Sequence, residues 1–412
     1  MIFGKHSGKG KDMGYTLKTA QYVNDFQCIG GKCTMDCCGH WDILWTNREV
    51  EKLKTSVHSD SLEVLIENSF IKRDEKTNLI KLCDDGDCPF HDKEDRLCKI
   101  QKEIGAEYLS MVCRNYPICG TINDNVLAKF RSLSCPAVFD LIIANEHSCD
   151  VFVYAKSYSE DDEMIFSIDT VNDVENNTSV RYRNQLFDFF YDIISNRKRD
   201  IYTSLIIGTL AAQTLSKLEH TSPERIPEGI ASISKQINSP ALIKSLSDIE
   251  PNYYVKLGVV QCMLDSTSVG DKIDPLLSSI RSRDDKNLNS VNIDLYITSL
   301  DKFKKTFANK PYIIKNIIRG FFLCELMPYS SKVHDLFDNY AFFCASAALI
   351  DFFAAAAAAG TDDKKEMLNR FKTLVCLASH PLCHSYQRVD KIVDHLKNVN
   401  CYSAGHLALI VK

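Results

Sequence analysis

Cysteine is distributed unevenly along this 412-residue chain, and the distribution constrains the fold more than any other feature of the sequence. Of the 17 cysteines, 11 lie in residues 1–149 and six lie in the rest of the chain. The first 18 residues are polar and lack the apolar segment of a secretory signal, so we expect a reducing, cytoplasmic location. In such a compartment, dense cysteines indicate metal or redox chemistry more often than structural disulfides.

The first four cysteines are the most closely spaced, because they fall within the eleven positions of Cys28-x4-Cys33-x3-Cys37-Cys38. A zinc ion or an iron–sulfur cluster needs about four thiolates that converge within a few ångströms. Close spacing on turns brings sulfurs together at a small entropic cost, and more distant cysteines complete the set when the domain folds. The spacing therefore predicts a metal centre in the N-terminal third of the chain.

The spacing does not decide between zinc and iron–sulfur. Zinc sites favour C-x2-4-C pairs set apart in the sequence, and the vicinal pair Cys37-Cys38 is awkward for one tetrahedral ion. The ferredoxin spacing C-x2-C-x2-C is also absent. His40 and His91 flank the cysteines and are additional candidate ligands. His380-x3-His384, with Cys383 between, has metal-pair spacing, but Pro381 favours a turn there. Four later cysteines lie on apolar helix faces and are expected to pack in the core: Cys262, Cys324, Cys344 and Cys376.

The chain is long enough for two domains, and we predict a mainly α fold. Residues 1–25 read as a loosely ordered leader, 26–150 as a Cys-rich metal-binding domain of short irregular elements, and 151–412 as a larger, mostly helical domain. An amphipathic helix is expected over 100–112 and a short strand over 78–82. Apolar periodicity predicts the longer helices over 180–194, 201–218, 253–264, 295–307, 311–326, 340–359 and 367–379.

Charge and hydropathy limit the partners that we expect. The formal net charge is −5, and Lys and Arg are dispersed among acids, so nothing indicates nucleic-acid binding. The one long apolar run, 341–359, is mostly Ala and contains Asp351, which favours a buried helix over a membrane span. Peripheral contact with a membrane and the oligomeric state stay open.

Several motifs together resemble the flagellin lysine-N-methylase family and, more loosely, the CxxCxxCC-type zinc/iron-chelating domains. The resemblance covers residues 22–140, whereas the helical remainder offers no comparably sharp motif. It rests on Phe26-x-Cys28-x4-Cys33-x3-Cys37-Cys38-x2-Trp41, Cys88-Pro89-Phe90, Leu97-Cys98-x-Ile100, Gly105-x2-Tyr108-Leu109-Ser110, Cys113-Arg114-x-Tyr116-Pro117 and Ser132-Leu133-Ser134-Cys135-Pro136.

The resemblance implies a cytoplasmic enzyme that methylates lysine side chains of flagellin with S-adenosylmethionine and binds an iron–sulfur cluster, most simply [4Fe–4S]. Ile118 stands where the family usually has Arg, and Cys83 and Cys119 are extra. No Gly-rich phosphate-type cradle marks a donor site, so catalytic and donor-binding residues stay unassigned. The alternative is a non-catalytic zinc- or iron-binding or redox-sensing module. The implied cluster ligands are drawn from Cys28, Cys33, Cys37, Cys38, Cys88, Cys98, Cys113 and Cys135.

Overall fold

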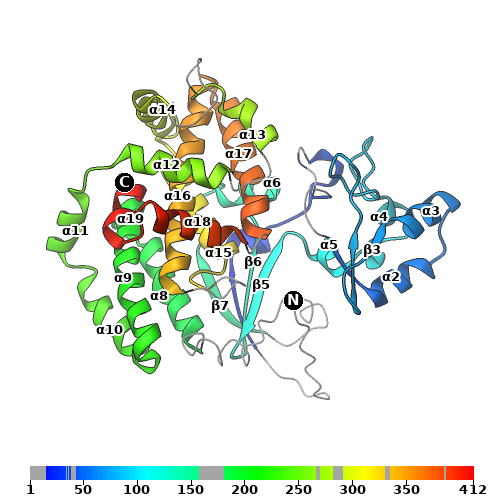
Figure 1. Ribbon diagram of the computed structural model, residues 1–412, viewed down its shortest axis with the longest axis horizontal. Helices are drawn as coiled ribbons and strands as arrows, with labels where there is room; N and C mark the ends of the chain where they lie inside the picture. The colour runs from blue at the N-terminus through cyan, green and yellow to red at the C-terminus, as the bar shows by residue number, and fades with distance from the viewer. Residues whose placement is uncertain are drawn as a thin grey trace.

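The computed structural model describes residues 15–33, 35, 37–38, 43–156, 181–265, 270–281, 291–329, 335–384 and 387–412. Two bodies stand side by side in Figure 1. We call residues 43–115 the Cys-rich lobe, and the described residues before 34 and after 115 the main body. The main body is mostly helical, which confirms the predicted mainly α fold.

The strands are β1 (Tyr15–Ala20), β2 (Leu44–Thr46), β3 (Phe70–Lys72), β4 (Thr77–Ile80), β5 (Ile118–Asn123), β6 (Val126–Arg131) and β7 (Val151–Lys156). The helices of the first 150 residues are α1 (Gln21–Asn24), η1 (Gly30–Lys32), α2 (Asn47–Lys54), α3 (Asp60–Asn68), α4 (Lys99–Glu103), η2 (Ala106–Tyr108), α5 (Met111–Asn115) and α6 (Pro136–Ile142), where η marks a 3-10 helix. The later helices are α8 (Arg183–Ser195), α9 (Ile201–Thr221), η5 (Pro223–Arg225), α10 (Ile226–Gln236), α11 (Pro240–Ser247), α12 (Tyr253–Asp265), α13 (Gly270–Leu277), α14 (Ile293–Thr306), α15 (Tyr312–Cys324), α16 (Leu336–Ala359), α17 (Lys364–His384), α18 (Gln387–Asn398) and α19 (Ala404–Val411).

The Cys-rich lobe is built on an antiparallel sheet in the order β2-β4-β3, with α2 and α3 packed beside it. Its small core includes Trp45, Leu53 and Phe90 and is separate from the core of the main body. A capping box starts α2, because the Thr46 side chain accepts the Glu49 N–H while the Glu49 carboxylate accepts the Thr46 N–H at 2.8 Å. The other carboxylate oxygen of Glu49 accepts the Met111 N–H at 2.7 Å, so the cap also fixes the start of α5.

The main body contains a four-stranded sheet in the order β5-β6-β1-β7, and this sheet changes two predicted boundaries. β1 pairs antiparallel with β7 along its whole length and parallel with β6 over residues 16–18. The predicted loose leader is therefore wrong for residues 15–25, while residues 1–14 lie outside the described part. The strand is hard to recognise in the sequence because Lys18 interrupts its apolar pattern. In the structure this lysine is buried and paired with Asp188 at 2.6 Å. The domain boundary predicted at residue 150 falls just before β7. This strand belongs to the same sheet as β5 and β6, so the sheet continues across that boundary.

Helix α16 forms the centre of the main body. Asp335 caps its N-terminus by accepting the Asp338 N–H at 3.2 Å, and every residue from Leu336 to Ala358 other than Asp338 is buried. The helix is long and apolar enough to cross a membrane by composition, but it is completely enclosed by protein here. A helix that is apolar on every side belongs in a protein interior or a bilayer, and this one lies in an interior.

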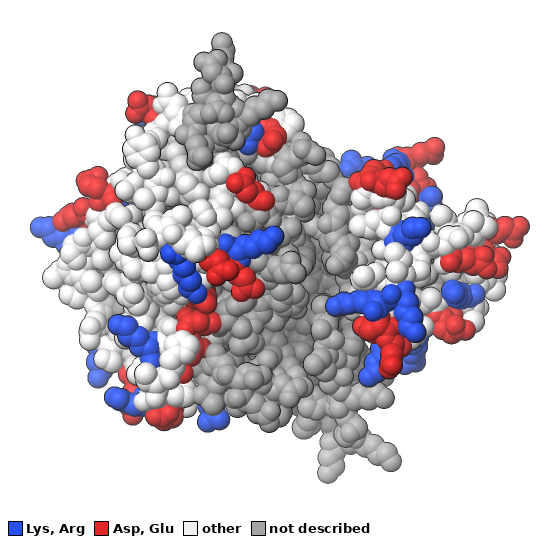
Figure 2. Space-filling model, viewed as in Figure 1, with Lys and Arg blue, Asp and Glu red and all other residues white. Residues whose placement is uncertain are grey.

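The seven predicted long helices correspond to α8, α9, α12, α14, α15, α16 and α17, and the predicted short strand corresponds to β4. Two local predictions are wrong. Residues 100–112 do not form one helix, because Gly105 has a φ of 107° and separates α4 from η2 and α5. Pro381 does not end its helix, since α17 continues to His384. Acidic and basic side chains are interspersed over the face shown in Figure 2.

Two helical glycines in the main body provide a matched test of its packing. A methyl group at Gly208 in α9 would overlap the Tyr340 side chain of α16, whereas a methyl group at Gly258 in α12 would meet nothing within 4 Å. We expect Gly208→Ala to destabilise the protein by about 1–3 kcal/mol through overpacking. Gly258→Ala should stabilise it by up to about 1 kcal/mol, because alanine favours the helix. Urea unfolding followed by circular dichroism measures both, and equal effects of the two substitutions would contradict the packing at α9 and α16.

Candidate metal centre

The first two predicted ligands lie in the main body, on the turn that follows α1. Gly30 has a φ of 58°, and its N–H points to the Cys28 Sγ at 3.5 Å. A side chain at Gly31 would collide with the backbone oxygen of Asp95, so this turn packs directly against the Cys-rich lobe. Cys33 closes the turn through a 2.9 Å hydrogen bond from its N–H to the Gly30 oxygen. The two glycines therefore shape the backbone around the cysteines.

The Cys-rich lobe supplies three further predicted ligands, each held by backbone geometry. Cys88 donates its N–H to the Cys38 oxygen at 2.6 Å, which fixes the vicinal pair against the lobe. Cys98 is the N-cap residue of α4, where the backbone N–H groups of Ile100 and Gln101 oppose the rise in its pKa that burial causes. Cys113 lies in α5, where the Ser110 side chain bonds both its backbone N–H and its thiol. Helix N-termini stabilise thiolates, so these positions suit metal ligands.

The main body contributes the last predicted ligand. Cys135 is the N-cap residue of α6, where the backbone N–H groups of Ala137 and Val138 oppose the rise in its pKa that burial causes. Helix α17 packs on α6 through an edge-on contact of Phe139 with Phe371, whose ring centroids are 5.7 Å apart. This contact brings Cys376 within electrostatic range of both Cys135 and Cys33.

Cys37 connects the two groups of thiols. Its sulfur is hydrogen-bonded to Cys38 and is an electrostatic neighbour of further cysteines from both bodies. The other cysteines whose pKa values respond to Cys37 are Cys33, Cys98, Cys113 and Cys135. Cys28 joins through Cys33, and Cys88 joins through Cys38, Cys98 and Cys113. We call the eight predicted ligands, which these pairwise electrostatic influences link where the Cys-rich lobe meets the main body, the thiol network. Among the described residues, no three of its sulfurs all lie within 4.8 Å of one another.

Burial and mutual repulsion raise the pKa values of these thiols. Burial raises the pKa of Cys88 to about 12, that of Cys113 to about 12 and that of Cys135 to about 11, and neighbouring thiols add to each shift. For Cys38 the hydrogen bond with Cys37 raises the pKa most, followed by burial. Several thiolates can share this space only if a cation compensates their charge, and a soft metal provides that compensation.

His91 is the other side chain of interest beside the network. The backbone of His91 pairs with that of Cys98 in an isolated antiparallel β-bridge, and its side chain is buried. Within the described residues neither of its ring nitrogens has a hydrogen-bond partner. It lines a depression of about 570 Å³ together with Cys83 and Cys88. Buried imidazole nitrogens are normally satisfied, so His91 stays a candidate ligand. His40 and Trp41 lie outside the described residues.

Two N-terminal cysteines outside the predicted set differ in position. Cys83 is exposed and adjoins Cys88, whereas Cys119 is half-buried near Cys324. Cys324, Cys344 and Cys376 are buried as predicted, and Cys262 is half-buried. Sequence reasoning missed the proximity of Cys376 to the network, because a lone cysteine within an apolar helix has the same pattern as a core residue.

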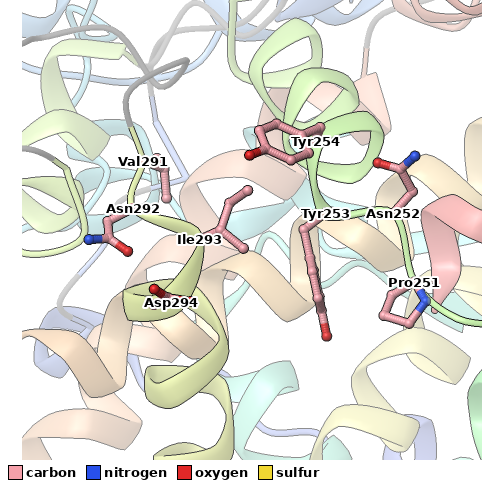
Figure 3. Close-up of a pocket in the computed structure, with 8 residues that line it drawn as sticks. All are labelled: Pro251, Asn252, Tyr253, Tyr254, Val291, Asn292, Ile293 and Asp294. Carbon is pink, nitrogen blue, oxygen red and sulfur yellow. The ribbon is translucent and has the colours of Figure 1, made fainter.

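Figure 3 shows a second depression, of about 660 Å³, between the start of α12 and the start of α14. Its lining includes Tyr253, Tyr254, Asn292 and Asp294 but no thiol. It is therefore distinct from the thiol network, and its side chains do not form a recognisable catalytic arrangement.

Comparison with known proteins identifies the family. The FliB lysine N-methylase C-terminal domain matches residues 187–410. The lysine-N-methylases of Salmonella choleraesuis (strain SC-B67) and Salmonella typhimurium (strain LT2) are each 26% identical over 261 residues. The flagellar biosynthetic protein FliU of Salmonella muenchen is 31% identical over 147 residues, which are 35% of this chain and 86% of FliU. No solved structure matches the chain.

The alignments with the two lysine-N-methylases cover 61% of this chain and 61% of each relative. The domain match falls in α8–α19, where the sequence showed no sharp motif. It nevertheless confirms the family that the cysteine motifs predicted. Because the matched domain covers more than half of its residues, the chain belongs to the FliB lysine N-methylase family.

Proposed function

We propose that this protein transfers methyl groups from S-adenosylmethionine to lysine side chains of flagellin in the cytoplasm. The observation that carries the proposal is the match of the FliB lysine N-methylase C-terminal domain to residues 187–410. The match covers the helices that enclose the core of the main body. Two of the related proteins are named lysine-N-methylases and a third is named a flagellar biosynthetic protein, which favours lysine as the acceptor and a flagellar protein as the substrate.

The thiol network fits an iron–sulfur centre. Iron–sulfur clusters are held by cysteine thiolates and tuned by the groups around the sulfurs. Cys98 and Cys135 lie at the N-termini of α4 and α6, and the Ser110 side chain adjoins Cys113, so these surroundings favour thiolate ligands. The eight predicted cysteines exceed the four that one [4Fe–4S] cluster needs, so the remainder would support the ligands or hold a second group. When bound, such a cluster would supply electron transfer or a rigid link between the lobe and the main body.

The protein must also prepare the lysine of the substrate. A lysine amine attacks a methyl group only when it is neutral, so the acceptor site has to lower its pKa by burial or provide a base. Among the described residues, the geometry does not single out that base or the site of the methyl donor. The depression beside His91 has acidic and basic side chains in its lining, including Asp92, Glu94 and Lys99, which suits a polar segment of a protein substrate.

A methylation assay tests the proposal directly. We expect protein purified without oxygen to add methyl groups to flagellin in the presence of S-adenosylmethionine, seen by intact-mass spectrometry as steps of one methylene each. Peptide mapping should place the added mass on lysines. Reactions without S-adenosylmethionine, and reactions with flagellin whose lysines have been acetylated, are the controls. An unchanged flagellin mass with metal-replete protein under anoxic, reducing conditions would contradict the proposed activity.

Metal analysis tests the nature of the metal centre independently of the methylation activity. Iron together with acid-labile sulfide supports the iron–sulfur proposal, whereas stoichiometric zinc without sulfide would replace it with a zinc centre. A protein that binds metal and leaves flagellin unmodified would instead fit the metal-binding module considered above.

A further inference from the structure

A second group of metal-ligand side chains lies inside the main body. Cys324 ends α15, Glu325 follows it, and Cys383 lies near the end of α17. The two sulfurs and one carboxylate oxygen all lie within 4.8 Å of one another. Cys324 is 4% exposed and Glu325 is 5% exposed, whereas Cys383 is half-buried.

The sulfur–sulfur distance distinguishes between the uses of this group. The Sγ atoms of Cys324 and Cys383 are 3.8 Å apart. A disulfide would require about 2.0 Å. Two thiolates bound to one tetrahedral zinc, each at about 2.3 Å, are separated by about 3.8 Å. The two sulfurs are therefore already spaced as ligands of one tetrahedral ion.

Cys119, at the start of β5, is a further thiol in the same region. Its electrostatic neighbours include Cys324 and Glu325, and it also acts on Cys383. Two or three thiols around a buried carboxylate form a soft, acidic donor set. Such a mixture of thiol and carboxylate ligands suits a divalent cation of the zinc class.

Another group of metal-ligand side chains in the main body lacks a thiol and has carboxylates with structural roles. Glu219, His220 and Asp335 also bring their ligand atoms within 4.8 Å of one another. The carboxylate of Glu219, however, accepts hydrogen bonds from the Tyr329 hydroxyl at 2.6 Å and the Leu336 N–H at 2.9 Å. Asp335 caps α16, so these acids are already used by the fold.

We propose that Cys324, Glu325 and Cys383 form a second metal site, for a tetrahedral divalent cation of the zinc class, with the fourth position taken by Cys119 or water. Binding would release the thiol protons to solvent. The site is separate from the thiol network but mechanically linked to it. Cys383 lies two helical turns beyond Cys376 on α17, a separation of about 10 Å along the helix. A cation here would tie the ends of α15 and α17 together and hold Cys376 in place beside Cys135.

The test measures zinc binding to the full chain, purified anaerobically with its N-terminal metal in place. We expect one zinc equivalent to bind the wild type and to be lost in Cys324→Ala and Cys383→Ala, with iron and sulfide unchanged. Cys344→Ala removes an equally buried thiol from α16 and should bind zinc as the wild type does. Cobalt bound at this site should show a sulfur-to-metal charge-transfer band, which the first two variants lose.

Glu325→Gln keeps the shape of the side chain and tests the site if the cysteine variants fold poorly. Its zinc affinity, measured against a chromophoric chelator, should fall by about tenfold or more. Wild-type zinc stoichiometry and affinity in Cys383→Ala would overturn the proposal, as would a Cys324–Cys383 disulfide in peptides mapped from anaerobically prepared protein. Unchanged affinity in Glu325→Gln would remove the carboxylate from the site and likewise overturn it as stated.

Discussion

Replacement of Cys37 by alanine should remove the metal from the N-terminal network. Cys37 is the thiol whose charge acts on Cys33, Cys38, Cys98 and others from both bodies, so its removal disconnects ligands that the lobe and the main body supply. We expect the iron content to fall to less than about a tenth of the wild-type value, because the loss of even a supporting residue lowers metal affinity by 10–100-fold. Iron and sulfide analysis of anaerobically purified protein measures this, and methylation of flagellin should fall in parallel.

The matched control is Cys344→Ala. Cys344 is completely buried in α16, with its sulfur 3.3 Å from the Thr209 hydroxyl, and its electrostatic surroundings do not include the network cysteines. This variant should keep its metal, although it loses some stability through a small cavity. Equal iron content in Cys37→Ala, Cys344→Ala and the wild type would rule out Cys37 as the connecting ligand. Loss of iron from both variants would indicate a general folding defect instead.

The long helices of the main body could be predicted from the sequence, because apolar periodicity is a local property of the chain. The four-stranded sheet could not be predicted in the same way. β1 pairs with β6 and β7, which lie more than 100 residues away, and the buried Lys18 interrupts the apolar pattern of a central strand. Its partner Asp188 lies on α8, so the compensation for this buried charge becomes visible only in three dimensions.

Part of the metal centre could be predicted for a similar reason. The turn from Cys28 to Cys38 has closely spaced cysteines, which local sequence reveals. Cys376 reaches the network only through the packing of α17 on α6, and Cys324 meets Cys383 only because the ends of α15 and α17 converge. These contacts depend on tertiary structure, and a single cysteine in an apolar helix carries no local signal of them.

The sequence signals of the family lie in two different parts of the chain. The cysteine motifs lie before residue 140, whereas the matched domain spans α8 to α19. The sheet joins the two parts, because β1, β5 and β6 precede the matched domain and pack against its core through Phe130 and Phe187, whose rings stack at 5.8 Å. The main body, which supplies Cys135 to the thiol network, therefore packs as one unit with the matched domain.

The second large effect is expected at the buried ion pair of the matched domain. Lys256 on α12 contacts Asp351 on α16 at 2.8 Å, and both side chains are 1% exposed. The Tyr202 hydroxyl of α9 donates to the same carboxylate at 2.9 Å, so three helices meet at this one group. Burial alone would lower the pKa of Lys256, but Asp351 outweighs it and raises the pKa, which keeps the lysine charged.

Asp351→Asn should destabilise the protein by about 3–5 kcal/mol, because it leaves the Lys256 charge buried without a partner. Lys256→Met should cost a similar amount, since it leaves the carboxylate unpaired. The double variant should be more stable than either single variant, because two neutral side chains remove both uncompensated charges, and Asn can still accept the Tyr202 hydrogen bond. Urea unfolding of the four proteins gives the coupling free energy directly. As a control, Lys93→Ala removes an exposed pair with Asp85 and should leave the unfolding midpoint unchanged. Additive effects of the two buried substitutions would show that the pair does not act as a unit.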